Sequence, residues 1–130
     1  MDFLKAKILD ESESLFSNAL IAIDFNMLQS LSHPNATFTT ESAEIYQGII
    51  NLHENYTAII KLVSIERLER KVQFHGNIAV VNSIERRVGL LNFINIESQY
   101  SITRIWKCLP KKCIVLSGCI VNQRSNLIQR

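Results

Sequence analysis

The sequence is poor in residues that interrupt regular structure. It has 4 glycines and 2 prolines among 130 residues, which excludes a collagen-like chain and leaves no room for a flexible linker. Its longest apolar runs, such as 19–23, are far shorter than the roughly 20 residues of a membrane-spanning helix. Acidic residues at positions 10, 11 and 13 break any apolar segment near the amino terminus, so no secretory signal is expected. We therefore expect no membrane segment and a cytoplasmic location.

Cysteine is scarce as well. Cys108, Cys113 and Cys119 are the three cysteines, and no two of them have the Cys-x-x-Cys spacing of a redox or zinc motif. Without a secretory signal they are expected to be reduced thiols. No two histidines share metal-ligand spacing with a carboxylate. These absences predict a protein without a metal or another cofactor.

What the chain does have is an ordinary globular composition, with 47% hydrophobic and 20% charged residues. The length fits one domain, so we predict a single domain over 1–130, with its core at about 3–121 and a polar tail at 122–130. The net charge of +2 and the lack of a basic aromatic stripe disfavour nucleic-acid binding.

The charge is unevenly distributed along the chain. Residues 1–65 hold 3 Lys/Arg against 8 Asp/Glu, whereas residues 66–130 hold 11 Lys/Arg against 4 Asp/Glu. We favour the interpretation that an acidic layer packs on a basic one. The alternative is an anionic ligand held by the second half.

The first half has the periodicity of helices. Apolar residues recur at helical spacing along 4–27 and define one broad face: Leu4, Ile8, Leu15, Phe16, Ala19, Leu20, Ile23 and Met27. The acidic and serine residues at 10–14 lie largely opposite that face. Asp24 can cap a second, short helix that ends at His33-Pro34-Asn35. A brief strand is expected at 36–40 and another helix at 48–63.

From about Ile65 the period changes to two. Four strands are predicted at 66–74, 78–88, 93–107 and 113–121, with turns at 75–77, 89–92 and 109–112. Helices followed by a meander of antiparallel strands indicate an α+β fold, with the helices on one face of a curved sheet.

Four short features, in this order, resemble the nuclear transport factor 2-like superfamily, which includes ketosteroid isomerase, scytalone dehydratase and SnoaL-type cyclases. They are Asp24 after the first helix, the glycine of Tyr46-Gln47-Gly48, the hairpin at 74–81 and Thr103-Arg104-Ile105-Trp106. The resemblance covers roughly 3–121 and is strongest to small bacterial members of mostly unknown function. It implies a cystatin-like roll, in which N-terminal helices pack on a curved mixed or antiparallel sheet and enclose a conical pocket.

The resemblance also places the two catalytic acids of ketosteroid isomerase at Thr40 and Thr103. A threonine cannot act as a general base near neutral pH, and it lacks the raised-pKa carboxyl group that donates to an oxyanion. The usual steroid isomerisation is therefore not expected. Glu41, Asp24 and His53 remain as weak candidates for acid–base catalysis. Their plainer interpretations are a loop carboxylate, a helix cap and a partly buried helical histidine.

Candidate ligand-binding residues come from the sheet and from the helix across it. The polar stripe at 99–103 is either the pocket lining or the solvent face, and in the first case Tyr100, Ile102 and Trp106 lie outside. Arg87 could hold a carboxylate bidentately or pair with Glu69 or Glu97. Cys119 stands where relatives often have a histidine, and it is either a reactive thiol or a small buried hydrophobe. The full set is Thr40, Tyr56, Arg87, Gln99, Ser101, Thr103 and Cys119.

The function that we favour is the binding of a small hydrophobic or amphiphilic molecule, because no convincing acid–base pair is present. The alternatives are an isomerase, dehydratase or cyclase that uses non-standard residues, and a dimerisation or assembly domain without a ligand. An outward face carrying Tyr100 and Trp106 would need cover, so we expect a homodimer through the sheet.

Overall fold

The computed structural model of the chain describes residues 3–55 and 61–122. Helices and strands follow one another as α1 (Phe3–Ala22), α2 (Phe25–Ser30), β1 (Ser32–Thr39), β2 (Ile45–Gln47), α3 (Ile49–Asn55), β3 (Lys61–His75), β4 (Ile78–Leu91), β5 (Ile94–Cys108) and β6 (Cys113–Asn122). Within these ranges, no helix is both long and apolar enough to cross a membrane.

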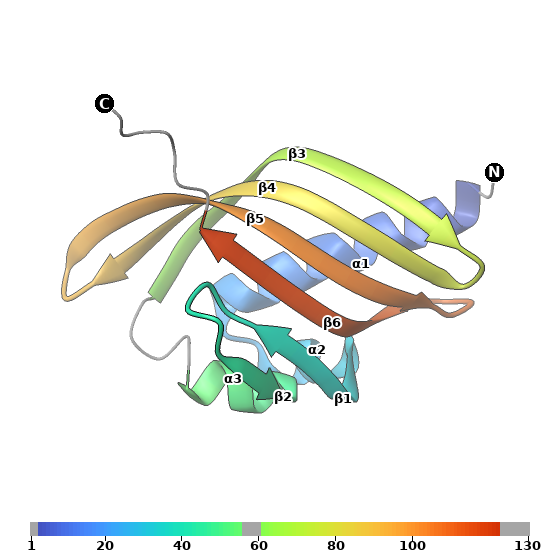
Figure 1. Cartoon of the computed structure of the whole chain (residues 1–130), viewed down its shortest axis with the longest axis horizontal. Coiled ribbons are helices and arrows are strands. Elements are labelled where there is room, and N and C mark those ends of the chain that lie inside the picture. The colour runs from blue at the N-terminus through green and yellow to red at the C-terminus, as the bar shows by residue number, and fades with distance from the viewer. Residues whose placement is uncertain (1–2, 56–60, 123–130) are drawn as a thin grey trace.

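The strands form one open, mixed sheet in the order β2-β1-β6-β5-β4-β3. β1 runs parallel to β6, and the other neighbours are antiparallel. Figure 1 shows α1 crossing behind the long strands, with α2 and α3 beside β1 and β2. We call the face that α1 covers the inner face and the opposite face the outer face. This architecture confirms the predicted α+β fold, with N-terminal helices on one face of a sheet.

Helix α1 packs on the sheet with only part of the face that the apolar pattern predicts, together with residues outside that face. The buried residues of α1 recur at helical spacing, and they are Leu9, Ser12, Glu13, Phe16 and Ala19. Three residues of the predicted face are exposed instead: Leu4 by 64%, Leu15 by 43% and Ile23 by 44%. The expectation that positions 10–14 lie away from the core is therefore wrong for Ser12 and Glu13.

The sheet supplies the partners that let this polar stripe be buried. The Ser12 hydroxyl accepts a hydrogen bond of 3.1 Å from the backbone N–H of Cys113. Trp106 is fully buried, and its ring meets the ring of Phe16 edge to face, with centroids 5.8 Å apart. Polar groups on α1 thus pair with groups on the sheet, while the aromatic rings fill the layer between them.

Ion pairs between α1 and the sheet account for part of the uneven charge distribution. Asp10 pairs with Arg70, and Nη1 of Arg67 lies 4.0 Å from the same carboxylate. Glu13 pairs with Arg104 on β5. Two acidic residues of the first half thus pair with arginines of the second half, which agrees with the favoured interpretation for these residues.

Several boundaries differ from the predictions. β1 begins at Ser32 and includes Pro34, where the register with β6 shifts because proline has no N–H for the ladder. The predicted helix at 48–63 is wrong at its end, since residues from Lys61 pair with β4 as strand. Strand β2 was not predicted, and the β4–β5 turn lies at Asn92-Phe93 rather than at 89–92.

Candidate functional site

A cavity of about 380 Å³ opens between the inner face of the sheet and the carboxyl-terminal half of α1. Irregularities in the β3–β4 and β5–β6 registers bend the strands around it. The wall is mainly apolar, and its large apolar side chains are Phe16 and Leu20 of α1, Phe38 of β1, Leu52 of α3, Leu62 of β3, Ile96 and Ile102 of β5, and Ile120 of β6. Such a wall suits the apolar part of a small molecule.

The backbone of β6 shapes one side of this wall at Gly118. Phe38 is the register partner of Gly118 across the β1–β6 pair. A Cβ atom at position 118 would lie only 3.1 Å from Cδ1 of Phe38. The absence of a side chain at Gly118 therefore lets the Phe38 ring lie flat against β6 beside the cavity.

Arg104 of β5 lines the cavity and forms a buried ion pair with Glu13 of α1. Arg104 donates from Nε and Nη2 to the two oxygens of Glu13, at 2.8 Å each. The indole N–H of Trp106 donates to the same carboxylate at 2.7 Å. Arg104 and Glu13 are only 4% and 5% exposed, so this pair is shielded from water.

Glu85 of β4 extends the ion pair into a chain of four charged groups. Its Oε2 accepts from Nη2 of Arg104 at 3.2 Å. Its Oε1 accepts from Nε and Nη2 of Arg87, at 3.0 and 2.9 Å. The Arg87 guanidinium also lies 5.9 Å from the centroid of the Tyr100 ring. Two arginines and two glutamates alternate, so the chain has no net charge.

The environment keeps the central pair ionised. Burial alone would raise the pKa of Glu13, but the charge and hydrogen bonds of Arg104, together with the indole of Trp106, bring that pKa below its ordinary value. Burial alone would lower the pKa of Arg104, and the opposing effect of Glu13 and then Glu85 raises it instead. Glu13 is therefore a carboxylate, and Arg104 a cation, across the neutral range.

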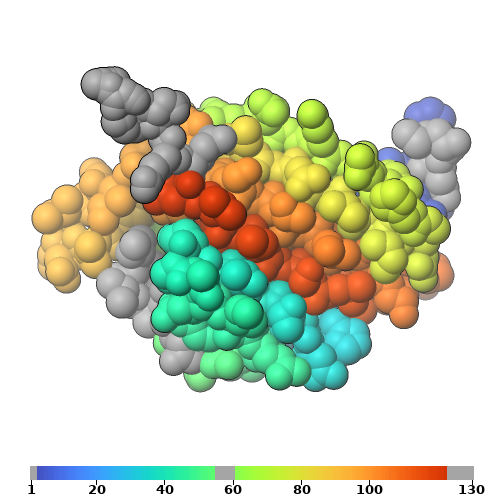
Figure 2. All heavy atoms as spheres, in the orientation of Figure 1, coloured from blue at the N-terminus to red at the C-terminus, as the bar shows by residue number. Residues whose placement is uncertain are grey.

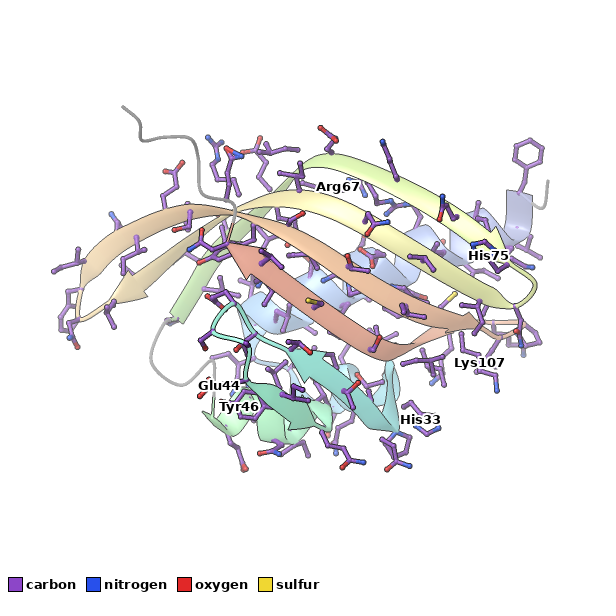
Figure 3. All side chains as sticks on the ribbon, in the orientation of Figure 1. His33, Glu44, Tyr46, Arg67, His75 and Lys107 are labelled. Atoms are coloured by element: carbon purple, nitrogen blue, oxygen red, sulfur yellow. The ribbon has the colours of Figure 1, made fainter. Side chains whose placement is uncertain are left out.

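The rim of the cavity is the connection between β1 and β2. The Thr40 hydroxyl accepts from the N–H of Glu44 at 3.3 Å and lies 3.1 Å from the Ser42 hydroxyl. The Tyr46 hydroxyl donates to the Glu44 carboxylate at 3.1 Å, and Figure 3 shows these two side chains together at this edge. Glu41 and Glu44 both line the cavity opening and are exposed. The rim is thus acidic.

Three of the predicted ligand-binding residues lie at the cavity: Thr40, Arg87 and Cys119. Cys119 contributes backbone, because it is the register partner of Thr103 and its thiol shares the outer face with that residue. Tyr56 lies outside the described residues. Binding of a ligand by these residues remains a prediction.

The expectation that Gln99, Ser101 and Thr103 line the pocket is wrong. These residues alternate with Tyr100, Ile102 and Arg104, and it is the second set that lines the cavity. The Thr103 hydroxyl instead donates to Asn82 at 2.8 Å on the outer face. The polar stripe is therefore the outer face of β5, which was the other option that the alternation left open.

The three weak catalytic candidates do not form a group. The exposed Asp24 caps α2, with its carboxylate accepting from the N–H of Met27 at 3.2 Å. The His53 ring packs edge to face against Phe25, with centroids 4.4 Å apart, and it is not part of the cavity wall. Glu41 alone reaches the cavity, at its rim. The plainer interpretations therefore describe Asp24 and His53.

Arg104 of the cavity wall was missed by sequence reasoning, and so were Glu13 and Glu85, which pair with it but are not lining residues themselves. The signal for them was present in their spacing. Glu13 lies four residues after Leu9 and three before Phe16, on one helical face. Glu85 and Arg104 share the alternation of the buried Val81 and Trp106 on their strands. These polar residues are found by asking which positions share the spacing of buried apolar residues. A search for apolar residues alone does not find them.

The cysteines and histidines do not assemble into a reactive or metal-binding cluster in the described residues. The three cysteines are free thiols, and burial, with Cys108 close by, raises the pKa of Cys113 to about 12. His33 and His75 lie apart, near the start of β1 and at the end of β3 (Figure 3). Across 3–55 and 61–122, no three His, Cys, Asp or Glu side chains are grouped as metal ligands.

The fold was compared with known proteins. No protein-family model and no curated protein matches the sequence. A solved NTF2-like protein from Cytophaga hutchinsonii matches with a TM-score of 0.77 at 16% identity, over 94% of this chain and 99% of that one. The CaMKII hub of S. rosetta matches with a TM-score of 0.71 at 14% identity, over 86% and 92%. A protein from Shewanella frigidimarina, provisionally named a ketosteroid isomerase, matches with a TM-score of 0.69 at 14% identity, over 85% and 91%. At identities this low, the matches show a shared fold and nothing about function.

Proposed function

Since this chain has the nuclear transport factor 2-like fold, we propose that it binds a small hydrophobic or amphiphilic molecule in the cavity beneath α1. The observation that carries the proposal is the mainly apolar cavity of about 380 Å³. This volume falls within the range of about 300–1,000 Å³ that ligand pockets occupy. Its wall combines large apolar side chains with a few buried polar groups, which is the composition that orients a small ligand.

Binding is favoured over catalysis because the two buried carboxylates that pair with the arginines of the wall are already occupied. Every oxygen of Glu13 and Glu85 accepts at least one hydrogen bond from an arginine. A general base needs a lone pair that can reach a substrate proton. Burial alone would raise the pKa of Glu13, but its pairing with Arg104 brings that pKa below its ordinary value. At the rim, the Thr40 hydroxyl is held within its own turn.

A second candidate function is an isomerase, dehydratase or cyclase that uses Glu41. Its carboxylate is at the cavity rim, and the matched protein from Shewanella frigidimarina carries the name of an isomerase. Conversion of a bound compound by the wild type, and its loss in Glu41→Gln with binding retained, would favour this function. Unchanged ligand after prolonged incubation would favour binding alone.

The proposal is tested with a neutral apolar probe, N-phenyl-1-naphthylamine, whose fluorescence rises in an apolar environment. We expect saturable binding to the wild type. Ile96→Trp, which fills space in the cavity wall, should weaken binding by at least about tenfold. Ile94→Trp is the matched control, because Ile94 lies on the same strand, is 66% exposed and is outside the wall. No saturable binding, or equal binding by both variants, would contradict the proposal.

Self-association through the outer face of the sheet is part of the same proposal. The outer face carries half-buried apolar residues such as Val80 and Ile105. Among the matched structures is a CaMKII hub, which supports assembly as a third candidate function. In such a homodimer the outer faces meet, and the two cavities lie on the inner faces, away from the interface. Binding and assembly are therefore compatible.

A further inference from the structure

In the four-residue ion chain, one nitrogen of each arginine donates no hydrogen bond to another described residue. All four oxygens of the two carboxylates accept a hydrogen bond from an arginine. Arg104 and Arg87 each donate through Nε and Nη2. Within the described residues, neither arginine has a partner at Nη1, although each Nη1 carries two N–H groups. Each Nη1 therefore has N–H groups left for a ligand, whereas every carboxylate oxygen already accepts a hydrogen bond.

These donors are accessible from the cavity. In the part of the chain that the structure describes, the fully enclosed side-chain nitrogen and oxygen atoms without a partner are Arg70 Nη1 and Ser83 Oγ. Nη1 of Arg104 and of Arg87 are not among them, so each reaches open space. Arg104 is only 4% exposed, and both arginines line the cavity. The open space at Arg104 is therefore the cavity itself.

The geometry points to a carboxylate as the polar end of the ligand, bound by Nη1 of Arg87 and of Arg104, with the apolar part of the same molecule against Phe16 and Ile102. This inference rests on the proposed binding function and names its ligand class, a small apolar carboxylic acid. Guanidinium groups bind carboxylates with short, charge-assisted hydrogen bonds. Glu41 and Glu44 at the rim disfavour an anion there, which leaves the two arginines as its place.

The test compares octanoate with octanamide, which has the same chain but no charge. Isothermal titration of the wild type should show octanoate binding at least about tenfold more tightly, because hydrogen bonds to charged groups are worth more than neutral ones. Equal affinities, or tighter binding of octanamide, would overturn the inference. This comparison needs no variant, so it does not depend on a substitution being tolerated.

Arg87→Lys tests which residue is responsible. Lysine keeps the charge opposite Glu85 but has no Nη1, so the preference for octanoate should fall by about tenfold. The control is Arg86→Lys, because Arg86 faces the other side of β4 and pairs there with Glu66 and Glu97. If Arg87→Lys keeps the full preference for octanoate over octanamide, the assignment of Arg87 as a carboxylate-binding residue is overturned. Arg87→Met, checked for folding by its thermal midpoint, should abolish the preference.

The neutral probe separates the two levels of the proposal. Saturable N-phenyl-1-naphthylamine binding, together with no preference for octanoate, would overturn the carboxylate inference and leave the cavity as a binding site. Failure of both the probe and octanoate to bind would overturn the proposed function and this inference with it.

Discussion

Glu13 illustrates how a polar residue can be part of a helix's buried face. It accepts hydrogen bonds from Arg104 and Trp106, so burial does not leave its carboxylate without partners. Removing one member of a buried ion pair leaves the other charge unsatisfied, which costs more than the pair itself contributes. The carboxylate therefore connects the position of α1 to the cavity wall.

We predict that Glu13→Gln lowers the free energy of unfolding at pH 7 by about 3–5 kcal/mol. The reason is that Arg104 would then be a buried cation with Glu85 as its remaining charged partner. Glu11→Gln is the matched control, since Glu11 is exposed on the same helix and its substitution should change the free energy by less than about 0.5 kcal/mol. Urea unfolding of both variants measures the difference. Equal effects would mean that the Glu13 pair contributes nothing beyond a surface charge.

The same carboxylate predicts a dependence on pH. The folded chain holds the pKa of Glu13 below its ordinary value of 4.5, because the effect of Arg104 outweighs that of burial. The unfolded chain therefore takes up this proton first as the pH falls. The stabilisation is fully present above about pH 4.5 and is lost as the pH falls through the folded-state pKa. The difference in free energy of unfolding between wild type and Glu13→Gln should be constant from pH 7 to 5 and become smaller below pH 5. A difference that widens on acidification would contradict this sign.

At the scale of elements, the β4–β5 hairpin contains a strained turn. Asn92 and Phe93 both have positive φ angles, of 51° and 67°. A turn of this kind favours asparagine first and glycine second, because a side chain in the left-handed region costs roughly 1–2 kcal/mol. Phe93 is 98% exposed, so its ring contributes little packing to offset that cost.

We predict that Phe93→Gly raises the free energy of unfolding by about 0.5–1 kcal/mol, after allowance for the greater entropy of glycine in the unfolded chain. Thermal unfolding measures the change. Phe93→Ala provides the control, because it also removes the ring but keeps a Cβ atom at the same φ. If the alanine variant is stabilised as much as the glycine variant, the ring rather than the backbone is responsible.

The elements that the sequence predicted correctly are those with long, regular periods. The strands β4 and β5 alternate over many residues, and the predicted order of β4, β5 and β6 is confirmed. The errors occur where tertiary pairing decides. Residues 61–63 end the predicted helix, yet Lys61 and Leu62 pair with Leu90 and Gly89 of β4. Strand β2 has three residues, which is too short for a period to be recognised.

At the scale of the whole molecule, the fold was predictable while the polar wall of the cavity was predictable only in part. The order of helices and strands indicated both the α+β class and the shared fold. Arg87 was identified from alternation, but the ion chain that holds it depends on Glu13, which lies 91 residues from Arg104 in sequence. A contact over that separation requires the packing of α1 on the sheet, which one sequence does not reveal.

The outer face of the sheet determines how copies of the molecule could associate. The reason first given for a homodimer is wrong, because Trp106 is fully buried beneath α1 and Tyr100 lines the cavity. A different reason remains. In Figure 2 the strands β3 to β6 lie side by side on the visible face, with no helix over their coloured atoms. Val80 and Ile105 are register partners on that face, near the start of β4 and the end of β5, and Val121 of β6 is 53% exposed.

We therefore predict a homodimer in which the outer faces of two sheets meet. Light scattering behind a sizing column should give twice the mass of 14.9 kDa at micromolar concentration. Ile105→Glu should give a monomer, because two carboxylates would be buried across the two-fold axis of a self-complementary interface. Phe3→Glu is the control, since Phe3 is 83% exposed at the start of α1, on the opposite side of the sheet. A wild-type monomer would contradict the prediction, and a dimer that survives Ile105→Glu but not Phe3→Glu would transfer the interface to the helical side.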